Sequence, residues 1–322
     1  MNLLEAKNVK TYYHTREGFV KAVDGVSIEV RQNEILGIAG ESGCGKSTLI
    51  NTLTMNIRPP MRFIDGTIVL DGIEISKMTR NELKKKIWGV VISLVPQSAM
   101  NCLMPTMRII DLIKDIVKYH INVSESEILS MAKRRFEELN LPIEALKMYP
   151  HELSGGMRQR AVIATSTILN PKLLIVDEPT SALDVSTQKQ VLRTLKNLRE
   201  TGIVKGMIFV AHDIAVLRQI VDRLAVMYAG KIAEIGNIED IIFRPRHPYT
   251  KLLINAVVSP EPEVKKRGIT YIPGEPPNLL NPPSGCRFHP RCPYAREKCK
   301  REEPILRELD GRILACHFPL EE

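Results

Sequence analysis

The 322-residue chain is 44% hydrophobic and 25% charged, an ordinary globular composition that is sufficient to bury a core. No apolar stretch approaches the roughly 18 to 20 residues that cross a bilayer, and Met1 to Thr11 is too polar for a signal peptide, so we expect a cytoplasmic protein that reaches any membrane through a partner. The 45 Lys and Arg against 37 Asp and Glu give a net charge of +8, which fits a nucleotide, a nucleic acid, an anionic membrane or simply a solvated surface.

The N-terminal part of the chain predicts strands, a loop and a helix in that order. Leu3 to Lys10 and Val20 to Val30 are β-rich around the turn signal Asp24-Gly25, and Ile35 to Ala39 is an apolar run. A glycine-rich loop follows, and Ser47 to Ile57 predicts a helix. A glycine loop between a buried strand and a helix is the setting of a phosphate-binding loop.

The glycine loop matches the P-loop pattern at every fixed position. Its glycines allow consecutive backbone N–H groups to point at phosphate oxygens, and the following helix contributes the positive end of its dipole. Lys46 should reach the β and γ phosphates of ATP, and Ser47 should place its hydroxyl on Mg²⁺. The predicted ATP-binding residues of the loop are Ser42, Gly43, Cys44, Gly45, Lys46, Ser47 and Thr48.

The middle of the chain changes to helical periodicity. Between Asn101 and Asn140 apolar residues recur on one side of a helix, so we expect a helical insertion within a subdomain over approximately residues 98–160. After it strands and helices alternate, which predicts a parallel sheet with helices packed on it. The expected elements are helix Gly156–Leu169, strand Leu173–Val176, helix Ser186–Arg199, strand Met207–Ala211, helix Ile214–Ile220 and strand Leu224–Tyr228.

The strand Leu173 to Val176 ends in two acidic residues. A buried strand of this kind points the side chains at its carboxyl end into the crevice where α/β sheets bind ligands. Asp177 is the expected Mg²⁺ partner, and Glu178 is placed to orient an attacking water or accept its proton. An acidic pair alone is more often a helix N-cap region, but the P-loop upstream favours an ATPase.

Four further motifs accompany these two elements. They are Val95-Pro96-Gln97, Leu153-Ser154-Gly155-Gly156-Met157-Arg158-Gln159-Arg160, Ser181-Ala182-Leu183-Asp184, and His212 at the end of a strand. With them, Leu3 to Gly236 resembles the ATP-binding cassette family of transporter ATPases. The resemblance implies an α/β P-loop NTPase fold, with a RecA-like parallel sheet core, an N-terminal antiparallel β subdomain and a helical insertion.

The resemblance also implies a site shared by two cassettes that close head to tail on two ATP molecules. Ser154, Gly155 and Gly156 open a helix, whose N–H groups suit an anion, and would bind the γ-phosphate held by the opposite subunit. Gln97 would contact Mg²⁺ and link the site to the membrane subunit. The implied catalytic residues are Glu178, His212, Gln97 and Lys46, and His212 would contact the γ-phosphate. Asp184 would lie at the dimer interface. The implied Mg²⁺ ligands are Ser47, Gln97 and Asp177.

An aromatic side chain stacks on adenine in members of the family. Tyr13 or Tyr12 occupies the corresponding stretch, and the insertion-like Thr15 to Gly18 that follows leaves the register open. We take Tyr13 as the predicted adenine contact, while packing in the core or at a sheet edge is the alternative role of such a tyrosine.

The C-terminal part is rich in proline, which disfavours long helices, so we expect a nucleotide-binding domain over residues 1–243 and a separate loop-rich module over residues 244–322. Arg246 to Leu253, Pro273-Gly274 and Gly285 to Cys292 resemble the tail of the oligopeptide and dipeptide importer branch. That resemblance implies an ATPase on the cytoplasmic face of the cell membrane. Its partners would be two membrane permease subunits, a second related ATP-binding subunit and an extracytoplasmic solute-binding protein, without nucleic acid.

Four of the six cysteines lie in this module: Cys286, Cys292, Cys299 and Cys316. Cytosolic thiols are kept reduced, and four thiolates in a loop-rich fold suit tetrahedral Zn²⁺ or an iron–sulfur cluster. None of the gaps has the two-residue spacing typical of zinc ribbons, and the importer branch carries a [4Fe–4S] cluster here, so the resemblance implies that cluster. Zinc and unligated or oxidised cysteines are the alternatives.

We therefore predict an ATP-hydrolysing importer subunit in which ATP binding closes a dimer and hydrolysis at Glu178 reopens it. Peptides are the default solute of the branch, and oligosaccharides, such as gluco- or cello-oligosaccharides, or nickel are alternatives. A cassette ATPase of nucleic-acid or translation function is an alternative of another class, although the chain has neither long coiled coils before the signature nor a second cassette. A non-hydrolysing regulatory subunit is disfavoured by the intact Lys46, Asp177, Glu178 and His212.

Overall fold

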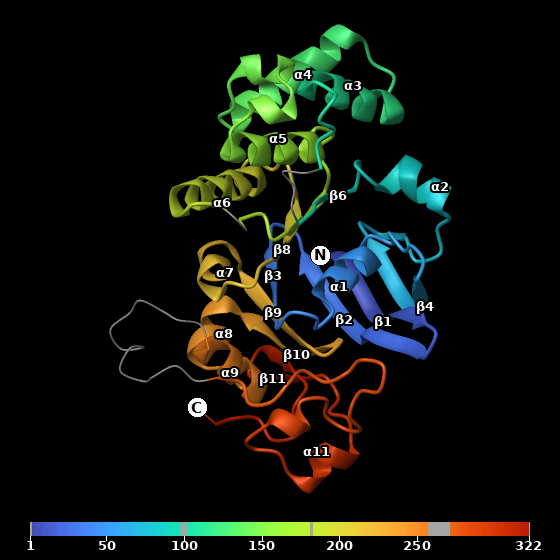
Figure 1. The fold of residues 1–322 in the computed structure, drawn as a ribbon, viewed down its shortest axis with the longest axis vertical. Coiled ribbons are helices and arrows are strands. Elements are labelled where there is room, and N and C mark those ends of the chain that lie inside the picture. Colours follow the sequence, from blue (N-terminus) through green and yellow to red (C-terminus); the bar gives the residue numbers. More distant parts are fainter. Residues whose placement is uncertain (1, 98–101, 181–182, 257–270, 322) are drawn as a thin grey trace. The chain divides into compact units, whose positions relative to one another are not determined.

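The computed structural model describes residues 2–97, 102–180, 183–256 and 271–321. The chain divides into two compact units. The first unit comprises Met1–Leu3, Arg31–Asn33 and Lys77–Ile208, and the second comprises Leu4–Val30, Glu34–Ser76 and Phe209–Glu322. Figure 1 shows the path of the chain from the N-terminal strands in blue to the C-terminal loops in red.

An antiparallel sheet of four strands, in the order β2-β1-β4-β5, belongs mainly to the second unit (Figure 1). Val26, Ile28 and Val30 in β2 are buried and alternate with more exposed residues, because successive side chains of a strand point to opposite faces. The expected N-terminal antiparallel subdomain is confirmed. Its strands are β1 Asn2–Thr15, β2 Gly18–Arg31, β4 Met61–Leu70 and β5 Ile73–Glu74.

Five further neighbouring strands of the second unit follow the order β3-β9-β10-β12-β11. β3 Ile35–Ala39 pairs parallel with β9 Arg223–Tyr228, and β10 Lys231–Asn237 pairs antiparallel with β9. All five residues of β3 are buried, which explains its continuous apolar sequence. β12 Arg312–Leu314 pairs with β10, and β11 Arg307–Leu309 pairs with β12, so the C-terminal residues add two strands.

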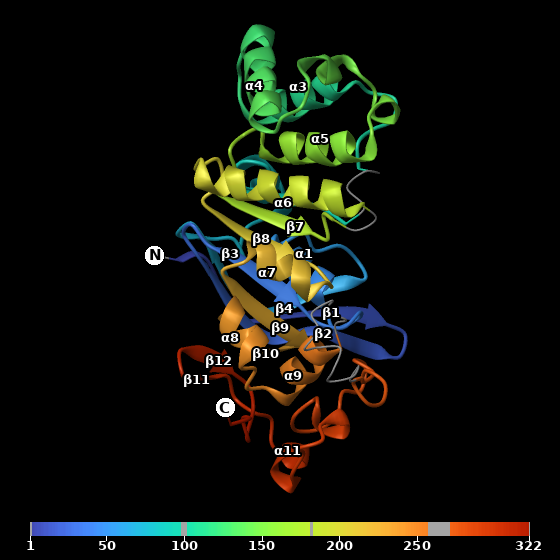
Figure 2. The same cartoon turned by 90° about the vertical axis from the view of Figure 1, so that its left-hand side faces the viewer.

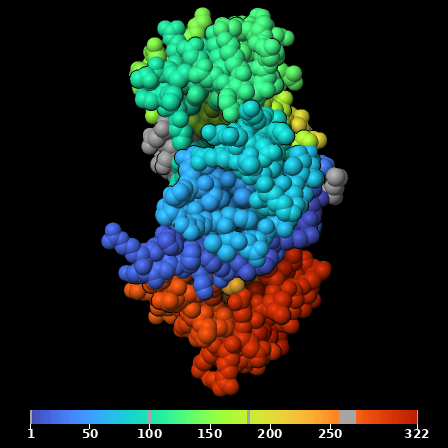
Figure 3. Space-filling view, turned by 90° about the vertical axis from the view of Figure 1, so that its right-hand side faces the viewer, coloured from blue at the N-terminus to red at the C-terminus, as the bar shows by residue number. Residues whose placement is uncertain are grey.

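Short helices cover the strands of the second unit, and α8 and α9 lie beside β10 (Figure 2). The helix predicted over Ser47–Ile57 ends earlier, because Met55 has a left-handed φ of 52° that stops it. The space-filling view shows the C-terminal residues, in orange and red, directly against the N-terminal strands in blue (Figure 3). The helices are α1 Lys46–Leu53, α7 Ile214–Ile220, α8 Ile238–Phe243, α9 Pro248–Asn255 and α11 Glu297–Arg301, with a 3-10 turn His289–Arg291.

The first unit contains the predicted helical insertion as two helices, α3 Ile109–His120 and α4 Glu125–Glu138, which pack with α5 Gly155–Thr167 (Figure 1). The second helix starts anew because Ser124 caps it: its hydroxyl accepts the N–H of Glu127, whose carboxylate accepts the N–H of Ser124. The first residues of the predicted subdomain, 98–101, lie outside the described residues.

The remaining elements of the first unit centre on a parallel strand pair, β6 Ile92–Val95 with β7 Leu173–Asp177. Helix α6 Val185–Glu200 follows β7, and β8 Gly206–Val210 carries the chain from the first unit into the second. In the part of the chain that the structure describes, no helix has the length and hydropathy to cross a membrane. Smaller helical segments are α2 Arg80–Glu82, the π-helical turn Leu83–Ile87, and the 3-10 turns Ile143–Lys147 and Pro150–Glu152.

Candidate active site

The glycine loop lies in the second unit between β3 and α1, where the sequence predicts it. Gly40 and Gly45 have φ values of 153° and 109°. A Cβ atom on Gly40 would lie 2.2 Å from the carbonyl oxygen of Met227, and one on Gly45 would lie 2.1 Å from that of Ala22. Both positions therefore require glycine, for the backbone conformation and for the close approach of another strand.

Lys46 is buried at the start of α1, and its ammonium group is held inside the loop. Its Nζ donates to the carbonyl oxygens of Gly40 at 2.7 Å and of Glu41 at 3.0 Å. Phosphate oxygens bound in the loop would compete for the same donors. Burial raises the pKa of the Cys44 thiol, so this side chain stays neutral. Of the other predicted loop residues, Thr48 is buried and Ser42, Gly43 and Ser47 are exposed.

Tyr13 contacts the helix that follows the loop. Its hydroxyl lies 3.0 Å from Oγ1 of Thr48. The hydroxyl of Tyr12 instead donates to Oδ1 of Asp24 at 2.6 Å, within the strands. Of the two tyrosines left open by the sequence, Tyr13 is thus the one hydrogen-bonded to the first turn of α1.

The two acidic residues lie in the first unit, at the end of β7. Asp177 is the last residue of that strand and is buried. Glu178 follows with a left-handed φ of 48°, a conformation that is uncommon outside glycine and clusters at functional sites. Nε2 of Gln97 donates to Oε2 of Glu178 at 2.7 Å, so two predicted catalytic side chains meet at the carboxyl ends of neighbouring strands.

The signature segment forms the N-terminus of α5 in the same unit. Ser154 is the N-cap residue, and its hydroxyl accepts the N–H of Met157 at 3.3 Å. Gly156 faces α6 closely, because a Cβ there would lie 2.9 Å from Cγ2 of Thr187. The backbone N–H groups and dipole of this helix end favour an anion, as the sequence predicts.

Asp184 is the N-cap of α6. It accepts the hydroxyl of Ser186 at 2.6 Å, and the hydroxyl and N–H of Thr187 at 2.6 and 3.0 Å. These hydrogen bonds, with that from Ser186 the largest cause, lower the pKa of the Asp184 carboxyl and keep it ionised. Ser181 and Ala182 of the same motif lie outside the described residues.

His212 belongs to the second unit, in the loop between β8 and α7, and is exposed. Asp213 caps α7 by accepting the N–H of Ala215 at 2.7 Å, which fixes the end of this loop. The structure therefore joins Gln97 to Glu178 within one unit, and Tyr13 to the phosphate-loop helix within the other.

The four C-terminal cysteines line one cavity together with aromatic side chains, including Phe288 and Phe318. Burial is the main cause that raises the pKa of three of the thiols, those of Cys286, of Cys292 (to about 11) and of Cys316 (to about 12). Among the described residues, no group of three or more His, Cys, Asp or Glu side chains is arranged to hold a metal ion. The four thiols thus share the lining of one cavity.

Comparison with known proteins decides the family. Residues 23–181 match the family described as ABC transporter, and residues 233–299 match the oligopeptide/dipeptide transporter C-terminal region. The dipeptide transport ATP-binding protein DppD of Caldanaerobacter subterraneus is 43% identical over 319 residues, which span 98% of this chain and 97% of that protein. The chain belongs to the ATP-binding subunits of ABC transporters.

Other relatives of this ABC subunit agree. The oligopeptide transport ATP-binding protein OppD of Escherichia coli is 40% identical over 326 residues, 99% of this chain and 94% of that protein. A solved dimer of the ATP-binding cassette MJ0796 with ADP and Pi matches 73% of this chain and 98% of its own, with 27% identity and a TM-score of 0.65. The predicted cassette fold and family are confirmed.

As a member of this family, the subunit binds and hydrolyses ATP, with Mg²⁺ as the expected metal. The names of these relatives refer to dipeptides and oligopeptides. None of them refers to oligosaccharides or nucleic acids, so those two alternatives gain no support from the comparison.

One set of residues around the phosphate loop has no signature in the sequence. Arg291 and Tyr249 both contact Glu41, the second residue of the loop. Arg291 lies in the run Gly285 to Cys292 and Tyr249 in the run Arg246 to Leu253, which the sequence marks only as features of the C-terminal module. Nothing local in the sequence connects them with a loop more than two hundred positions earlier.

Proposed function

We propose that this ABC subunit drives the import of dipeptides or oligopeptides from the cytoplasmic face of the cell membrane. The observation that carries the proposal is the match of residues 233–299 to the C-terminal region of oligopeptide and dipeptide transporters. Relatives of nearly the same length, named for dipeptide and oligopeptide transport, support it. The working complex would contain two membrane permease subunits, a second related ATP-binding subunit and an extracytoplasmic solute-binding protein.

For ATP hydrolysis we propose that the loop from Ser42 to Thr48 holds the phosphates and that Tyr13 contacts adenine. Ser47, Gln97 and Asp177 would hold Mg²⁺, and their hydroxyl, amide and carboxylate oxygens are the donors this ion prefers. When bound, the ion neutralises charge that develops on the phosphates. Glu178 orients the attacking water and accepts its proton, while Lys46 and His212 act on the γ-phosphate.

The cassette would work as one half of a dimer. We propose that Ser154, Gly155, Gly156 and Asp184 complete the ATP site of the opposite cassette. The position of the first three at a helix N-terminus supports this role, as does the dimeric arrangement of the similar cassette MJ0796. In this proposal residues 1–243 form the nucleotide-binding domain, approximately 98–160 its helical subdomain, and 244–322 the C-terminal module.

Purification of the tagged subunit from detergent-solubilised membranes tests the transport function. We expect two permease subunits and a second ATP-binding subunit to copurify. In proteoliposomes, ATP hydrolysis should increase several-fold when the solute-binding protein of the same complex is loaded with a mixture of di- to pentapeptides. Stimulation by cello-oligosaccharides, Ni²⁺ or nucleic acid in place of peptides would contradict the proposal.

The C-terminal cysteines are proposed to hold a [4Fe–4S] cluster, with zinc as the less favoured occupant. The shared cavity of Cys286, Cys292, Cys299 and Cys316 supports this, since four thiolates are the usual ligand set of such clusters. When bound, the cluster would cross-link a module whose strands have only three residues each. Its role would be structural.

Iron and acid-labile sulfide in protein purified without oxygen test the cluster. We expect about four of each per chain, with visible absorption, because a complete cluster contains that number. Cys292→Ser should lose both, whereas the control Cys102→Ser, at an exposed cysteine outside the module, should keep them. Zinc or no metal in the unaltered protein would contradict the cluster and leave the ATPase assignment intact.

A further inference from the structure

Glu41, inside the phosphate loop, is anchored by two residues of the C-terminal part of the chain. Nη1 of Arg291 donates to Oε2 of Glu41 at 2.7 Å, and Nη2 donates to Oε1 at 3.0 Å. This two-fold pairing of guanidinium and carboxylate fixes both position and orientation. The backbone N–H of Glu41 donates to the hydroxyl of Tyr249 at 2.9 Å. Side chain and backbone of one loop residue are therefore both held from outside the loop.

Arg291 is itself rigidly placed, with a side chain only 5% exposed. Its Nε donates to the carbonyl oxygen of Pro273 at 2.8 Å, and its Nη1 also donates to the hydroxyl of Tyr228 at 3.3 Å. It ends a 3-10 turn, His289–Arg291, so its backbone is also ordered. A buried guanidinium with all three nitrogens bonded keeps one orientation, because any other would leave buried donors unpaired.

Tyr249 is equally constrained. It is fully buried in α9, and its ring lies 4.5 Å from that of Tyr228 and 5.3 Å from that of Phe288, measured between centroids. Contacts of this kind hold an aromatic ring in place. The hydroxyl that accepts the Glu41 N–H is thus a fixed point.

The anchored residue in turn positions the lysine of the loop. Nζ of Lys46 donates to the carbonyl oxygen of Glu41 at 3.0 Å and to that of Gly40 at 2.7 Å. Tyr249 therefore holds the peptide group between Gly40 and Glu41, and Arg291 holds the side chain of Glu41. A shift of Glu41 would move two acceptors that hold the Lys46 ammonium group.

The ion pair between Arg291 and Glu41 also changes the net charge of the phosphate loop. The carboxylate of Glu41 lies within a loop that binds polyanionic phosphates, so alone it would repel ATP. The guanidinium of Arg291 neutralises it, and Lys46 supplies the positive charge for the phosphates. Without Arg291, the loop would carry the negative charge of Glu41 without the ion pair that balances it.

We propose that Arg291 is a positioning residue of the ATP site, which acts through Glu41 on the phosphate loop and on Lys46. The C-terminal part of the chain, through Arg291 and Tyr249, thereby sets the affinity for MgATP. This inference concerns nucleotide binding and is independent of the transported solute.

The test measures the Kd for MgATP of full-length Arg291→Met, Glu41→Gln and the double variant. We expect Arg291→Met to raise the Kd about tenfold, a coupling of the size common for contacting pairs. Glu41→Gln should raise it by about threefold or less. The double variant should resemble Glu41→Gln, because removing the carboxylate also removes the repulsion that Arg291→Met exposes. Added salt should shrink the effect of Arg291→Met.

Asp310→Asn is the matched control, because it removes an ion-pair partner of Arg246 in the same part of the chain but away from the loop. Its Kd should equal that of the unaltered protein. Additive effects of Arg291→Met and Glu41→Gln in the double variant would overturn the proposal. A loss of affinity in Asp310→Asn equal to that in Arg291→Met would also overturn it, because it would indicate general destabilisation. If Arg291→Met does not fold, Tyr249→Phe carries the test, because it removes the acceptor of the Glu41 N–H. We expect it to raise the Kd severalfold, and an unchanged Kd would overturn the proposal.

Discussion

Glu178→Gln is expected to bind MgATP with nearly unaltered affinity and to hydrolyse it at least about a hundred times more slowly. A positioned general base contributes about 10² to 10⁴ in rate, and an amide cannot take up the proton of the attacking water. The substitution keeps the shape of the side chain. Its carbonyl oxygen can still accept the hydrogen bond that Nε2 of Gln97 donates to Glu178 at 2.7 Å.

The slow step should also trap the closed form. If ATP binding closes the cassettes and hydrolysis reopens them, Glu178→Gln should form a stable ATP-dependent dimer with its partner ATP-binding subunit, visible by light scattering. The unaltered protein should form it only transiently. Single-turnover phosphate release and nucleotide binding, measured on the same preparation, separate loss of chemistry from loss of binding.

Glu144→Gln is a suitable control, since Glu144 is an exposed carboxylate in a 3-10 turn of the same unit. It should hydrolyse ATP at the normal rate. Hydrolysis at the normal rate by Glu178→Gln would remove Glu178 from the mechanism, and loss of ATP binding would assign it a structural role at the end of β7.

The parts of the site that the sequence predicts are those with local signatures. The phosphate loop is one continuous segment whose glycines are required by φ and by close contacts, so its pattern is visible without the fold. The acidic pair comes at the end of β7, whose residues Leu173–Val176 are buried and appear in the sequence as an apolar run. The contact between Gln97 and Glu178 depends on the pairing of β6 with β7, which the sequence does not show. For these two residues, the family resemblance implies only that they share a site.

Several strands were not predicted, for physical reasons. β4 contains Asp65-Gly66, which in sequence indicates a hairpin turn. In the structure this dipeptide lies inside a long strand at an irregular register with β1, where a Cβ on Gly66 would be 2.5 Å from Cα of Val9. β11 and β12 have three residues each in a proline-rich region, so they are too short for a period-2 pattern to be recognised.

The contacts between distant segments lie beyond sequence reasoning altogether. Arg291 and Glu41 are 250 positions apart, and no local sequence pattern connects them. The burial of Glu234 in β10 is likewise invisible in the sequence, because glutamate is normally exposed. Only the fold shows what compensates its charge.

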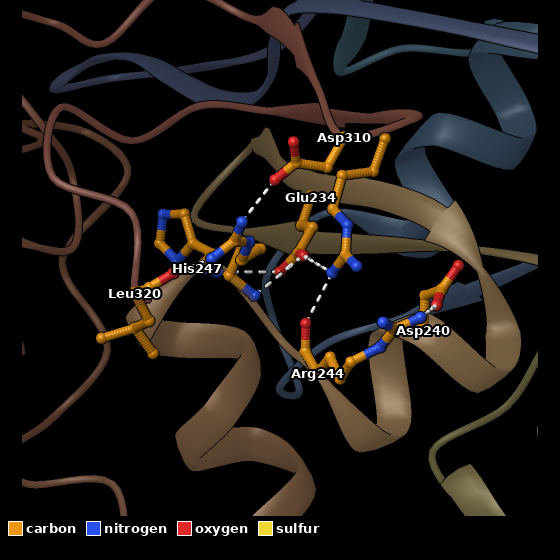
Figure 4. A network of polar contacts seen from close by, with 8 residues as sticks. Glu234, Asp240, Arg244, His247, Asp310 and Leu320 are labelled. Carbon is orange, nitrogen blue, oxygen red and sulfur yellow. Dashed lines mark hydrogen bonds and ion pairs between the residues drawn. The ribbon is translucent and has the colours of Figure 1, made fainter. Parts of the chain in front are cut away.

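Glu234→Leu is expected to lower the free energy of unfolding by about 3 to 5 kcal/mol, the usual cost of removing one partner of a buried ion pair. The carboxylate accepts the N–H of Arg246 at 3.0 Å, the N–H of His247 at 2.9 Å and Nη1 of Arg312 at 3.3 Å (Figure 4). Leucine would leave two backbone donors without their acceptor and a nearly buried guanidinium without its counter-charge. Denaturant unfolding, followed by circular dichroism, measures the change.

The double variant Glu234→Leu, Arg312→Met separates charge from packing. It should recover part of the lost stability, because the uncompensated guanidinium is gone while the apolar parts of both side chains remain. Glu239 lies on α8 and forms an exposed ion pair with Arg218 of α7. Glu239→Gln removes this ion pair and should change the unfolding free energy by less than about 0.5 kcal/mol. A loss in Glu234→Leu no larger than in Glu239→Gln would contradict the argument. A double variant less stable than Glu234→Leu would show that Arg312 stabilises the strand through its bond to the carbonyl oxygen of Arg244, at 2.6 Å, more than through its charge.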